Sequence, residues 1–214
     1  MNRTRKIILW TLLLSTAIGV LTNWSLGIST AGEEGLLRFH ARFFGYFTIA
    51  SNTLAGIMAS VLLFAGGGRV RRFVDRPTVQ AAVSMYVFFV GFGLWVLLGG
   101  PDYASFDSVP DWVADLTTHT FSPILGLVWF LVAVPRGSLG WRDPLRWLVY
   151  PALYWTYWIA LGSWIGLYPY FFVDFPELGI AGSLRWAGAI LVLALVVSYL
   201  AVAINSPPQG EMAE

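Results

Sequence analysis

The chain has 214 residues, of which 57% are hydrophobic and only 12% are charged, against about 25% charged in an ordinary soluble domain. It contains no cysteine, which excludes disulfides, thiolate metal sites and a cysteine nucleophile. A net charge of +1, without a basic patch interleaved with aromatic residues, excludes nucleic-acid binding. The composition therefore predicts an integral membrane protein, and we expect neither a metal nor a cofactor.

Six runs of mostly apolar residues are long enough to cross a bilayer, which takes roughly 20 residues in a helix. In chain order the predicted spans are 7–28, 43–65, 78–98, 112–134, 145–167 and 183–205. Turns rich in glycine and proline separate them, and Pro207-Pro208 follows the last span. Since no polar stretch is long enough for a second domain, we expect one all-α domain over residues 1–214, an integral membrane bundle of six transmembrane helices.

The first span has a second interpretation. Basic residues near the start, an apolar run and then Ser29-Thr30-Ala31 are also typical of a cleaved signal peptide. The apolar run is about 22 residues, longer than the roughly 7–15 residues of a signal core, so we favour a retained helix. Cleavage would leave five helices in unchanged orientations.

The distribution of charge predicts how the helices are oriented. Ten of the thirteen basic residues fall on one side of the predicted membrane: Arg3, Arg5, Lys6, Arg69, Arg71, Arg72, Arg76, Arg136, Arg142 and Arg146. The loops of the other side contain the acids Glu33, Glu34, Asp102, Asp107, Asp111, Asp174 and Glu177. Because basic loops stay in the cytoplasm, we expect both termini on the cytoplasmic side of the cell membrane.

The second predicted span carries small and polar residues on one face, at three- and four-residue spacing. They are Thr48, Ser51, Asn52, Ala55, Gly56, Ala59 and Ser60. The lower part of this stripe is best explained as a seam for helix packing. For Thr48 and Asn52 a seam and a functional site are equally good explanations, because a buried asparagine is costly without a partner.

The fourth predicted span contains the only histidine within a span, His119. Asp115 lies four residues before it, on the same face and one turn nearer the outside. Pro123 lies four residues after it, where it removes a backbone donor and frees the carbonyl of His119. A buried histidine can be purely structural, but ionisable residues inside a bilayer most often mark a working site. We expect His40, in the first outer loop, to be a solvated interfacial residue.

Thr48 and His119 are predicted at similar depths in the membrane. Thr48 follows Arg42 by six residues, and His119 follows Asp111 by eight. At 1.5 Å per residue, both lie about 10 Å below the outer boundary. They would therefore meet if the second and fourth helices are neighbours.

Aromatic residues near this level are candidates to line a substrate cavity. They are Tyr46, Tyr154, Tyr157, Trp158 and Tyr168. An interfacial aromatic belt explains the tyrosines of the last outer junction, but not Asp174, which is enclosed by aromatics and prolines. Gly162 and Gly166 form a GxxxG pair, which by default indicates close helix packing.

Four segments together carry a family resemblance. They are Tyr46–Asn52, the His119-Thr120 pair followed by Pro123, Tyr150–Tyr154 and Tyr168–Asp174. In this order, over spans two to five, they resemble the bacterial relatives of the androgen-induced-gene membrane proteins, a group that includes the androgen-dependent TFPI-regulating protein. The resemblance implies a multi-pass threonine hydrolase that cleaves fatty acid esters of hydroxy fatty acids. It also implies that Thr48 and His119 are the essential threonine and histidine.

These residues lead to a hypothesis of lipid-ester hydrolysis in the outer half of the membrane. Thr48 would attack the ester carbonyl while His119 takes its proton. Asp174 or Asp115 would orient the imidazole, and we prefer Asp174, because Asp115 shares a helix with His119 and is expected to point along it toward water. Asn52 would donate to the oxyanion, and Ser51 is a further supporting candidate.

Three other interpretations compete with the hydrolase. A proton-coupled transporter or small-molecule binder would use the same polar cavity, although the halves of the chain show no internal repeat. Haem ligation by His40 and His119 has poor geometry, since one is predicted in a loop and the other at depth. A purely structural scaffold leaves four residues unexplained at one level: Thr48, Asn52, His119 and Asp174.

Overall fold

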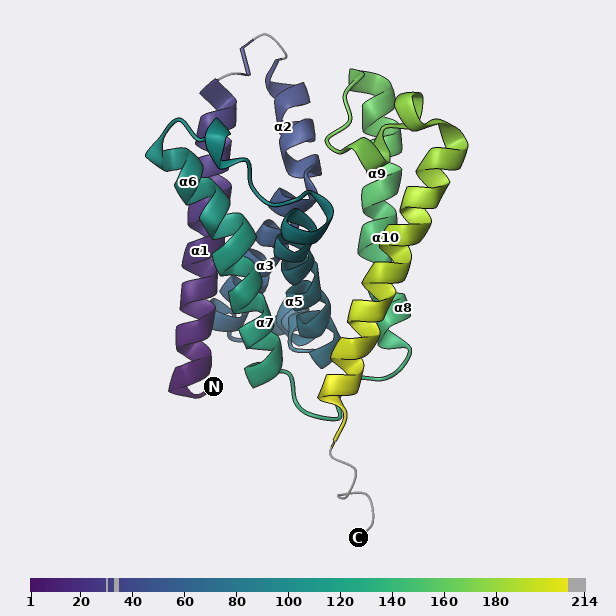
Figure 1. Ribbon diagram of the computed structural model, residues 1–214. Helices are drawn as coiled ribbons and strands as arrows, with labels where there is room; N and C mark the ends of the chain where they lie inside the picture. The colour runs from purple at the N-terminus through teal and green to yellow at the C-terminus, as the bar shows by residue number, and fades with distance from the viewer. Residues whose placement is uncertain (30, 33–34, 208–214) are drawn as a thin grey trace. The chain divides into compact units, whose positions relative to one another are not determined.

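The computed structural model describes residues 1–29, 31–32 and 35–207. Within these residues the chain forms helices and turns and no strand, which confirms the predicted all-α class (Figure 1). The predictions for Thr30, Glu33, Glu34 and Pro208 lie outside the described residues. The elements are α1 (Arg3–Ser29), α2 (Leu36–Gly45), α3 (Phe47–Phe64), α4 (Gly68–Val74), α5 (Pro77–Phe92), the π-helical η1 (Gly93–Leu97), the 3-10 turn η2 (Tyr103–Ser105), α6 (Val109–Leu116), the π-helical η3 (Thr117–Phe121), α7 (Ser122–Ala133), α8 (Asp143–Trp147), α9 (Val149–Ile165), the 3-10 turn η4 (Phe171–Val173) and α10 (Phe175–Asn205).

Five helices in the described part of the chain are long and apolar enough to cross a membrane, which supports a multi-pass membrane protein. They are Arg3–Ser29, Phe47–Phe64, Pro77–Leu97, Val109–Ala133 and Phe175–Asn205. The fifth predicted span, 145–167, corresponds to the end of α8 together with α9. Since α9 has only 17 residues, shorter than the other five, a bundle of six spans stays a prediction.

The second span differs from its prediction at its N-terminal end. The residues before Tyr46 belong to a separate helix, α2, and Tyr46 itself has extended backbone angles (φ −65°, ψ 131°). One face of α2 is buried, because Phe39 and Phe43 pack with Ile49 in a hydrophobic cluster. His40 belongs to α2, so its predicted position in a loop was wrong. Its Nδ1 lies 2.7 Å from the carbonyl oxygen of Leu36, and its Nε2 accepts the indole N–H of Trp24.

The helices group into two compact units, residues 1–135 and the residues from Arg136 on. The expectation that both units belong to one membrane domain stays a prediction. The first unit contains α1 to α7. The second contains α8, α9, η4 and α10.

The first unit is a bundle in which α1 packs on α3 and on the rod formed by α6, η3 and α7 (Figure 1). On the other side of the bundle, α5 packs on α3 and α7. Ala55 and Ala59 of α3 are fully buried, and Gly56 lies directly against Thr16 of α1. The lower part of the small-residue stripe is thus a packing seam, as predicted.

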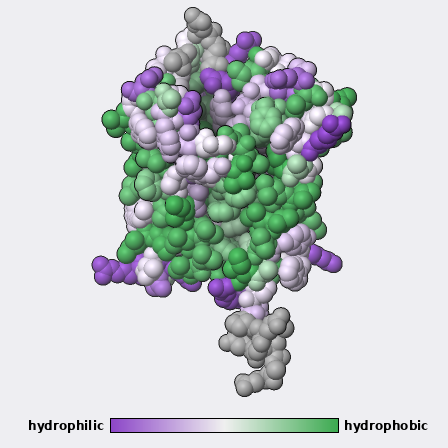
Figure 2. Space-filling model, viewed as in Figure 1, coloured by the Kyte–Doolittle hydropathy of each residue, from purple (hydrophilic) through white to green (hydrophobic). Residues whose placement is uncertain are grey.

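Basic residues gather at the end of the first unit where α1 begins and α3 ends. Arg5 of α1 donates to the carbonyl of Val132 at 3.3 Å, which ties the start of α1 to the end of α7. Arg71 donates to carbonyls in the last turn of α3, including that of Leu62 at 3.0 Å. Figure 2 shows hydrophobic residues over the middle of the helices and hydrophilic residues toward their ends. The cytoplasmic placement of this end stays a prediction.

The second unit explains the predicted GxxxG pair differently. Gly166 ends α9 in the left-handed conformation (φ 70°), and its N–H bonds the carbonyl of Gly162 at 2.8 Å. This is the usual way in which a glycine terminates a helix. Gly162 lies against the ring of Tyr168. The two glycines therefore end a helix and admit an aromatic ring, and the interpretation as a helix-packing pair was wrong.

Candidate active site

Thr48 and His119 meet in the first unit. Thr48 is the second residue of α3, and its Oγ1 lies 3.2 Å from Nε2 of His119, in the π-helical turn η3. The second and fourth predicted helices are therefore neighbours here, which the sequence left open. A hydroxyl within hydrogen-bond distance of an imidazole nitrogen is the geometry that a nucleophile and its general base require.

The acid that orients His119 is Asp115. Its Oδ1 lies 2.9 Å from Nδ1 of His119, on the side of the ring opposite Thr48. The preference for Asp174 was therefore wrong: the carboxylate one turn away along the helix points at the imidazole rather than toward water. Asp174 has a different role, since its Oδ1 caps α10 by accepting the backbone N–H of Glu177 at 3.2 Å.

These two contacts select one tautomer of the imidazole. A carboxylate only accepts hydrogen bonds, so the proton of the neutral ring lies on Nδ1, facing Asp115. Nε2 then presents its lone pair to the Thr48 hydroxyl. The hydroxyl of Thr118, 3.3 Å from Nδ1, offers a second and longer contact on the same side. The ring is thus set to accept a proton from Thr48.

Pro123 explains why this turn is π-helical. In η3 the N–H of Ser122 bonds the carbonyl of Thr117, five residues earlier. The next donor in this pattern would be the nitrogen of Pro123, which has no hydrogen to give to the carbonyl of Thr118. The carbonyl of Thr118, next to His119, therefore needs a hydrogen-bond donor from outside its own helix. π-Helical turns often occur at functional sites.

Asn52 supplies the missing donor. Its Nδ2 donates to the carbonyl of Thr48 at 2.9 Å and to the carbonyl of Thr118 at 3.3 Å, and the side chain is fully buried. Since an amide carries two N–H donors, both are used on the backbone. The predicted oxyanion role of Asn52 was therefore wrong, because its amide ties the start of α3, which contains Thr48, to the turn that contains His119. Its Oδ1 has no hydrogen-bond partner within the described residues.

We expect Asn52→Leu to lower the stability of the first unit and to slow any reaction at Thr48. The substitution preserves size but leaves the carbonyl of Thr118 without its side-chain donor, which costs about 1–3 kcal/mol for a buried group. Thermal unfolding in detergent measures the loss. The matched control is Thr53→Val on the same helix, which removes a buried hydroxyl that has no hydrogen-bond partner in the part of the chain that the structure describes. An Asn52→Leu melting temperature no lower than that of Thr53→Val would contradict this role.

Two glycines allow neighbouring helices to touch the π-helical turn. A Cβ added to Gly19 of α1 would lie 2.6 Å from Cγ2 of Thr118. A Cβ added to Gly91 of α5 would lie 2.7 Å from the carbonyl oxygen of His119 and 2.9 Å from Cβ of Pro123. All three distances are too short for van der Waals contact. The position of His119 therefore depends on the absence of side chains at these glycines.

We expect Gly91→Ala to destabilise the bundle by about 1–3 kcal/mol, the usual cost of overpacking. The new methyl group meets a backbone carbonyl and a proline ring, neither of which can move aside by changing rotamer. Gly93→Ala is the matched control, because nothing lies within 4 Å of a Cβ at Gly93. Thermal unfolding compares the two. Equal melting temperatures would show that η3 yields to the methyl group.

The remaining predicted residues are divided between the two units. Ser51 is fully buried in α3. Tyr46 is the N-cap residue of the same helix and packs against the cluster of Phe39 and Phe43. In the second unit, Tyr154 and Trp158 are buried, Tyr157 is exposed and Tyr168 is partly buried.

Sequence reasoning missed three residues that hold the turn of His119. Thr118 is fully buried, and its hydroxyl donates to the carbonyl of Ala114 at 2.7 Å. Ser15 of α1 contacts the carbonyl of Thr117 at 3.2 Å and the hydroxyl of Ser122 at 2.9 Å. The available signal was Pro123, because a proline inside a span implies carbonyls that need donors from neighbouring helices.

The site is sheltered but reachable. The His119 side chain is 22% exposed and that of Asp115 13% exposed, so a substrate can contact the ring while its carboxylate partner stays mostly covered. Within the described residues, no group of three or more histidines and acids is placed to hold a metal ion. The arrangement combines a hydroxyl, an imidazole and a carboxylate in series, as in hydrolases that use an activated alcohol.

Comparisons with family models, with curated proteins and with solved structures found no match to this chain. The resemblance to the androgen-induced-gene proteins therefore stays a prediction.

Proposed function

We propose that the protein is a membrane-embedded hydrolase of lipid esters, with Thr48 as the nucleophile. The observation that carries the proposal is the series Thr48–His119–Asp115, with contacts of 3.2 Å and 2.9 Å on opposite nitrogens of one imidazole. A threonine hydroxyl is a weak nucleophile at neutral pH without such a base. Thr48 and His119, which the sequence singled out by polarity and depth, thus lie in series with Asp115, and this arrangement supports the proposal.

The reaction has two steps. Oγ1 of Thr48 attacks the ester carbonyl carbon while its proton passes to Nε2 of His119, and the tetrahedral intermediate collapses when the leaving alkoxide takes that proton. This leaves the acyl group on Thr48 and releases the alcohol. Water then attacks the acyl-threonine, with Nε2 again accepting the proton and returning it to Oγ1 as the carboxylic acid leaves. Asp115 stabilises the imidazolium in both steps.

The start of α3 supports the negative charge that develops on the carbonyl oxygen. Thr48 lies in the first turn of this helix, where backbone N–H groups have no acceptor within the helix. The positive end of the helix dipole lies at the same place. We assign the oxyanion stabilisation to this turn, in place of the Asn52 amide.

The substrate class follows from the apolar surroundings. Thr48 and His119 both belong to helices that are long and apolar enough to span a membrane, so an ester with an acyl chain is the natural substrate. We propose fatty acid esters of hydroxy fatty acids, in accordance with the family resemblance. We further propose six spans with both termini in the cytoplasm, in accordance with the charge distribution.

The test is ester hydrolysis by the purified protein in detergent, with a branched fatty acid ester of a hydroxy fatty acid as substrate. His119→Ala is expected to lose the activity, and His40→Ala, which changes the chain's other histidine, is expected to retain it. Activity that survives in His119→Ala would refute the assignment. A folded parent without activity on this or other lipid esters would favour the transporter or binder, in which the same polar series holds a ligand or relays a proton.

A further inference from the structure

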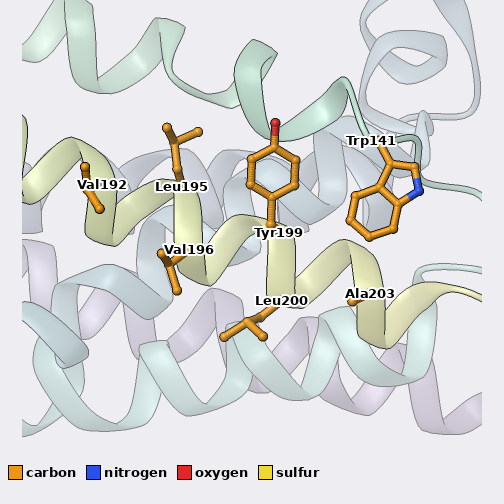
Figure 3. A pocket seen from close by; sticks show the side chains of 7 residues that line it. All are labelled: Trp141, Val192, Leu195, Val196, Tyr199, Leu200 and Ala203. Carbon is orange, nitrogen blue, oxygen red and sulfur yellow. The ribbon is translucent and has the colours of Figure 1, made fainter.

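An apolar groove lies along α10 in the second unit, remote in sequence from Thr48 and His119. Its volume is about 460 Å³, and Figure 3 shows the side chains that line it. The groove is lined by Trp141, Val192, Leu195, Val196, Tyr199, Leu200 and Ala203. All but Trp141 come from α10, at three- and four-residue spacing, so they form one stripe along the helix.

The length of this stripe matches one leaflet of a membrane. Val192 and Ala203 are eleven residues apart, which is about 16 Å along an α-helix. Half of a hydrocarbon core is about 15 Å. In addition, only 17% of the most apolar part of α10 is buried, although this is the most hydrophobic of the five candidate spans. A hydrocarbon chain of a lipid is therefore a suitable occupant for the groove.

One end of the groove has the features of a membrane interface. The rings of Trp141 and Tyr199 stack with centroids 6.1 Å apart and an angle of 25°. The Tyr199 hydroxyl points away from α10, at the end of the ring (Figure 3). Tryptophan and tyrosine prefer the level of the headgroups, where one part of the ring is apolar and the other is hydrated.

Positive charge lies at this same end. The segment 136–146, which contains Trp141, has three arginines and one aspartate. Arg136 donates to the carbonyl of Ile204, and Arg146 pairs with Asp143 at 3.0 Å. The side chain of Arg142, which follows Trp141 in the chain, is exposed and has no hydrogen bond or ion pair within the described residues. Of the three arginines in this segment, Arg142 is therefore the one whose guanidinium is free to bind an anion.

We propose that this groove binds an anionic glycerophospholipid, with one acyl chain along α10 and the phosphate at Arg142. The apolar stripe alone would accept any lipid, and the arginine makes the site selective for an anionic headgroup. The groove residues do not include Thr48 or His119, so the proposal does not depend on the hydrolase activity.

The experiment is native mass spectrometry of the detergent-purified protein, titrated with phosphatidylglycerol or phosphatidylcholine of identical acyl chains. Parent protein should bind phosphatidylglycerol more tightly. Arg142→Gln should weaken that binding about fivefold and leave phosphatidylcholine unchanged. Val196→Trp fills the groove and should weaken both lipids. The controls are Arg69→Gln, an exposed arginine of the first unit, and Leu191→Trp, which lies outside the groove lining.

Three results would overturn the proposal. Equal affinity of the parent for the two lipids would show that the groove does not select an anionic headgroup. An Arg142→Gln variant that binds phosphatidylglycerol as tightly as the parent would show that Arg142 does not contact the phosphate. A dimer in the parent that Val196→Trp converts to a monomer would show that a second copy of the chain covers the groove.

Discussion

Thr48→Ala is expected to abolish ester hydrolysis, with a loss of about 10³-fold or more in kcat, whereas Thr48→Ser keeps a measurable part of it. Alanine removes the oxygen that forms the covalent bond to the acyl group. Serine keeps that oxygen and loses only a methyl group, which weakens the fixed rotamer of a β-branched side chain. The measurement is the rate of release of the hydroxy fatty acid by each purified variant.

Thr53→Val provides the control for this series. Thr53 lies on the same helix, and its buried hydroxyl has no hydrogen-bond partner among the described residues. Its replacement should leave the rate unchanged. If Thr48→Ala retained the parental rate, the nucleophile would be another residue. A transporter or binder would tolerate both substitutions at Thr48 better than the loss of His119.

Asp115→Asn is expected to lower kcat by about 10³-fold while the protein stays folded. The asparagine is nearly the same size as the aspartate, but its amide can donate to Nδ1 of His119 and so favour the tautomer with the proton on Nε2. That tautomer cannot accept the proton of Thr48. In a Ser-His-Asp hydrolase the equivalent change lowers kcat by about 10⁴-fold for the same reason.

Asp174→Asn is the control that separates the two candidate acids. Asparagine at position 174, the N-cap of α10, still accepts the N–H of Glu177, so the cap is retained. Asp174→Asn should therefore keep both stability and activity. The reverse pattern, with Asp174→Asn inactive and Asp115→Asn active, would contradict this assignment and favour Asp174 as the acid that orients His119.

The costs of burial in a membrane singled out Thr48 and His119 in the sequence, and the family resemblance implied that they are the essential threonine and histidine. A histidine and a threonine at matching depth, with Pro123 one turn below the histidine, are expensive unless they have partners. The structure brings Thr48 and His119 together as that argument requires. The helical class followed in the same way from the long apolar runs, since a membrane chain must satisfy its backbone within helices.

The supporting residues could not be assigned from the sequence, because their roles depend on local geometry. The contact of Asp115 with His119 depends on which way each side chain turns along the helix. The role of Asn52 depends on which backbone carbonyls lack donors, and that follows from the π-helical turn. Likewise, the sequence around Gly91 is rich in aromatic residues and does not indicate that this position must be a glycine. Only the packing of α5 on η3 shows why a side chain does not fit there.

The boundaries of the second span illustrate a different difficulty. Hydrophobicity is continuous from Phe43 through Tyr46 into α3, so the sequence indicated one helix beginning at 43. In the structure the helix is interrupted at Tyr46, and the residues before it form α2, on which Phe39 and Phe43 are buried. This break makes Thr48 a first-turn residue of α3, which the proposed oxyanion stabilisation requires.

The most direct test of the central claim is to locate the covalent intermediate. The purified protein is treated with a fluorophosphonate bearing an alkyl chain, whose phosphorus a hydrolase nucleophile attacks with loss of fluoride. The modified residue is then identified by peptide mass spectrometry. We predict a single adduct on Thr48 that Asp115→Asn slows and Thr48→Ala abolishes. An adduct on another residue, or ester hydrolysis that continues while Thr48 stays unmodified under saturating probe, would contradict the account.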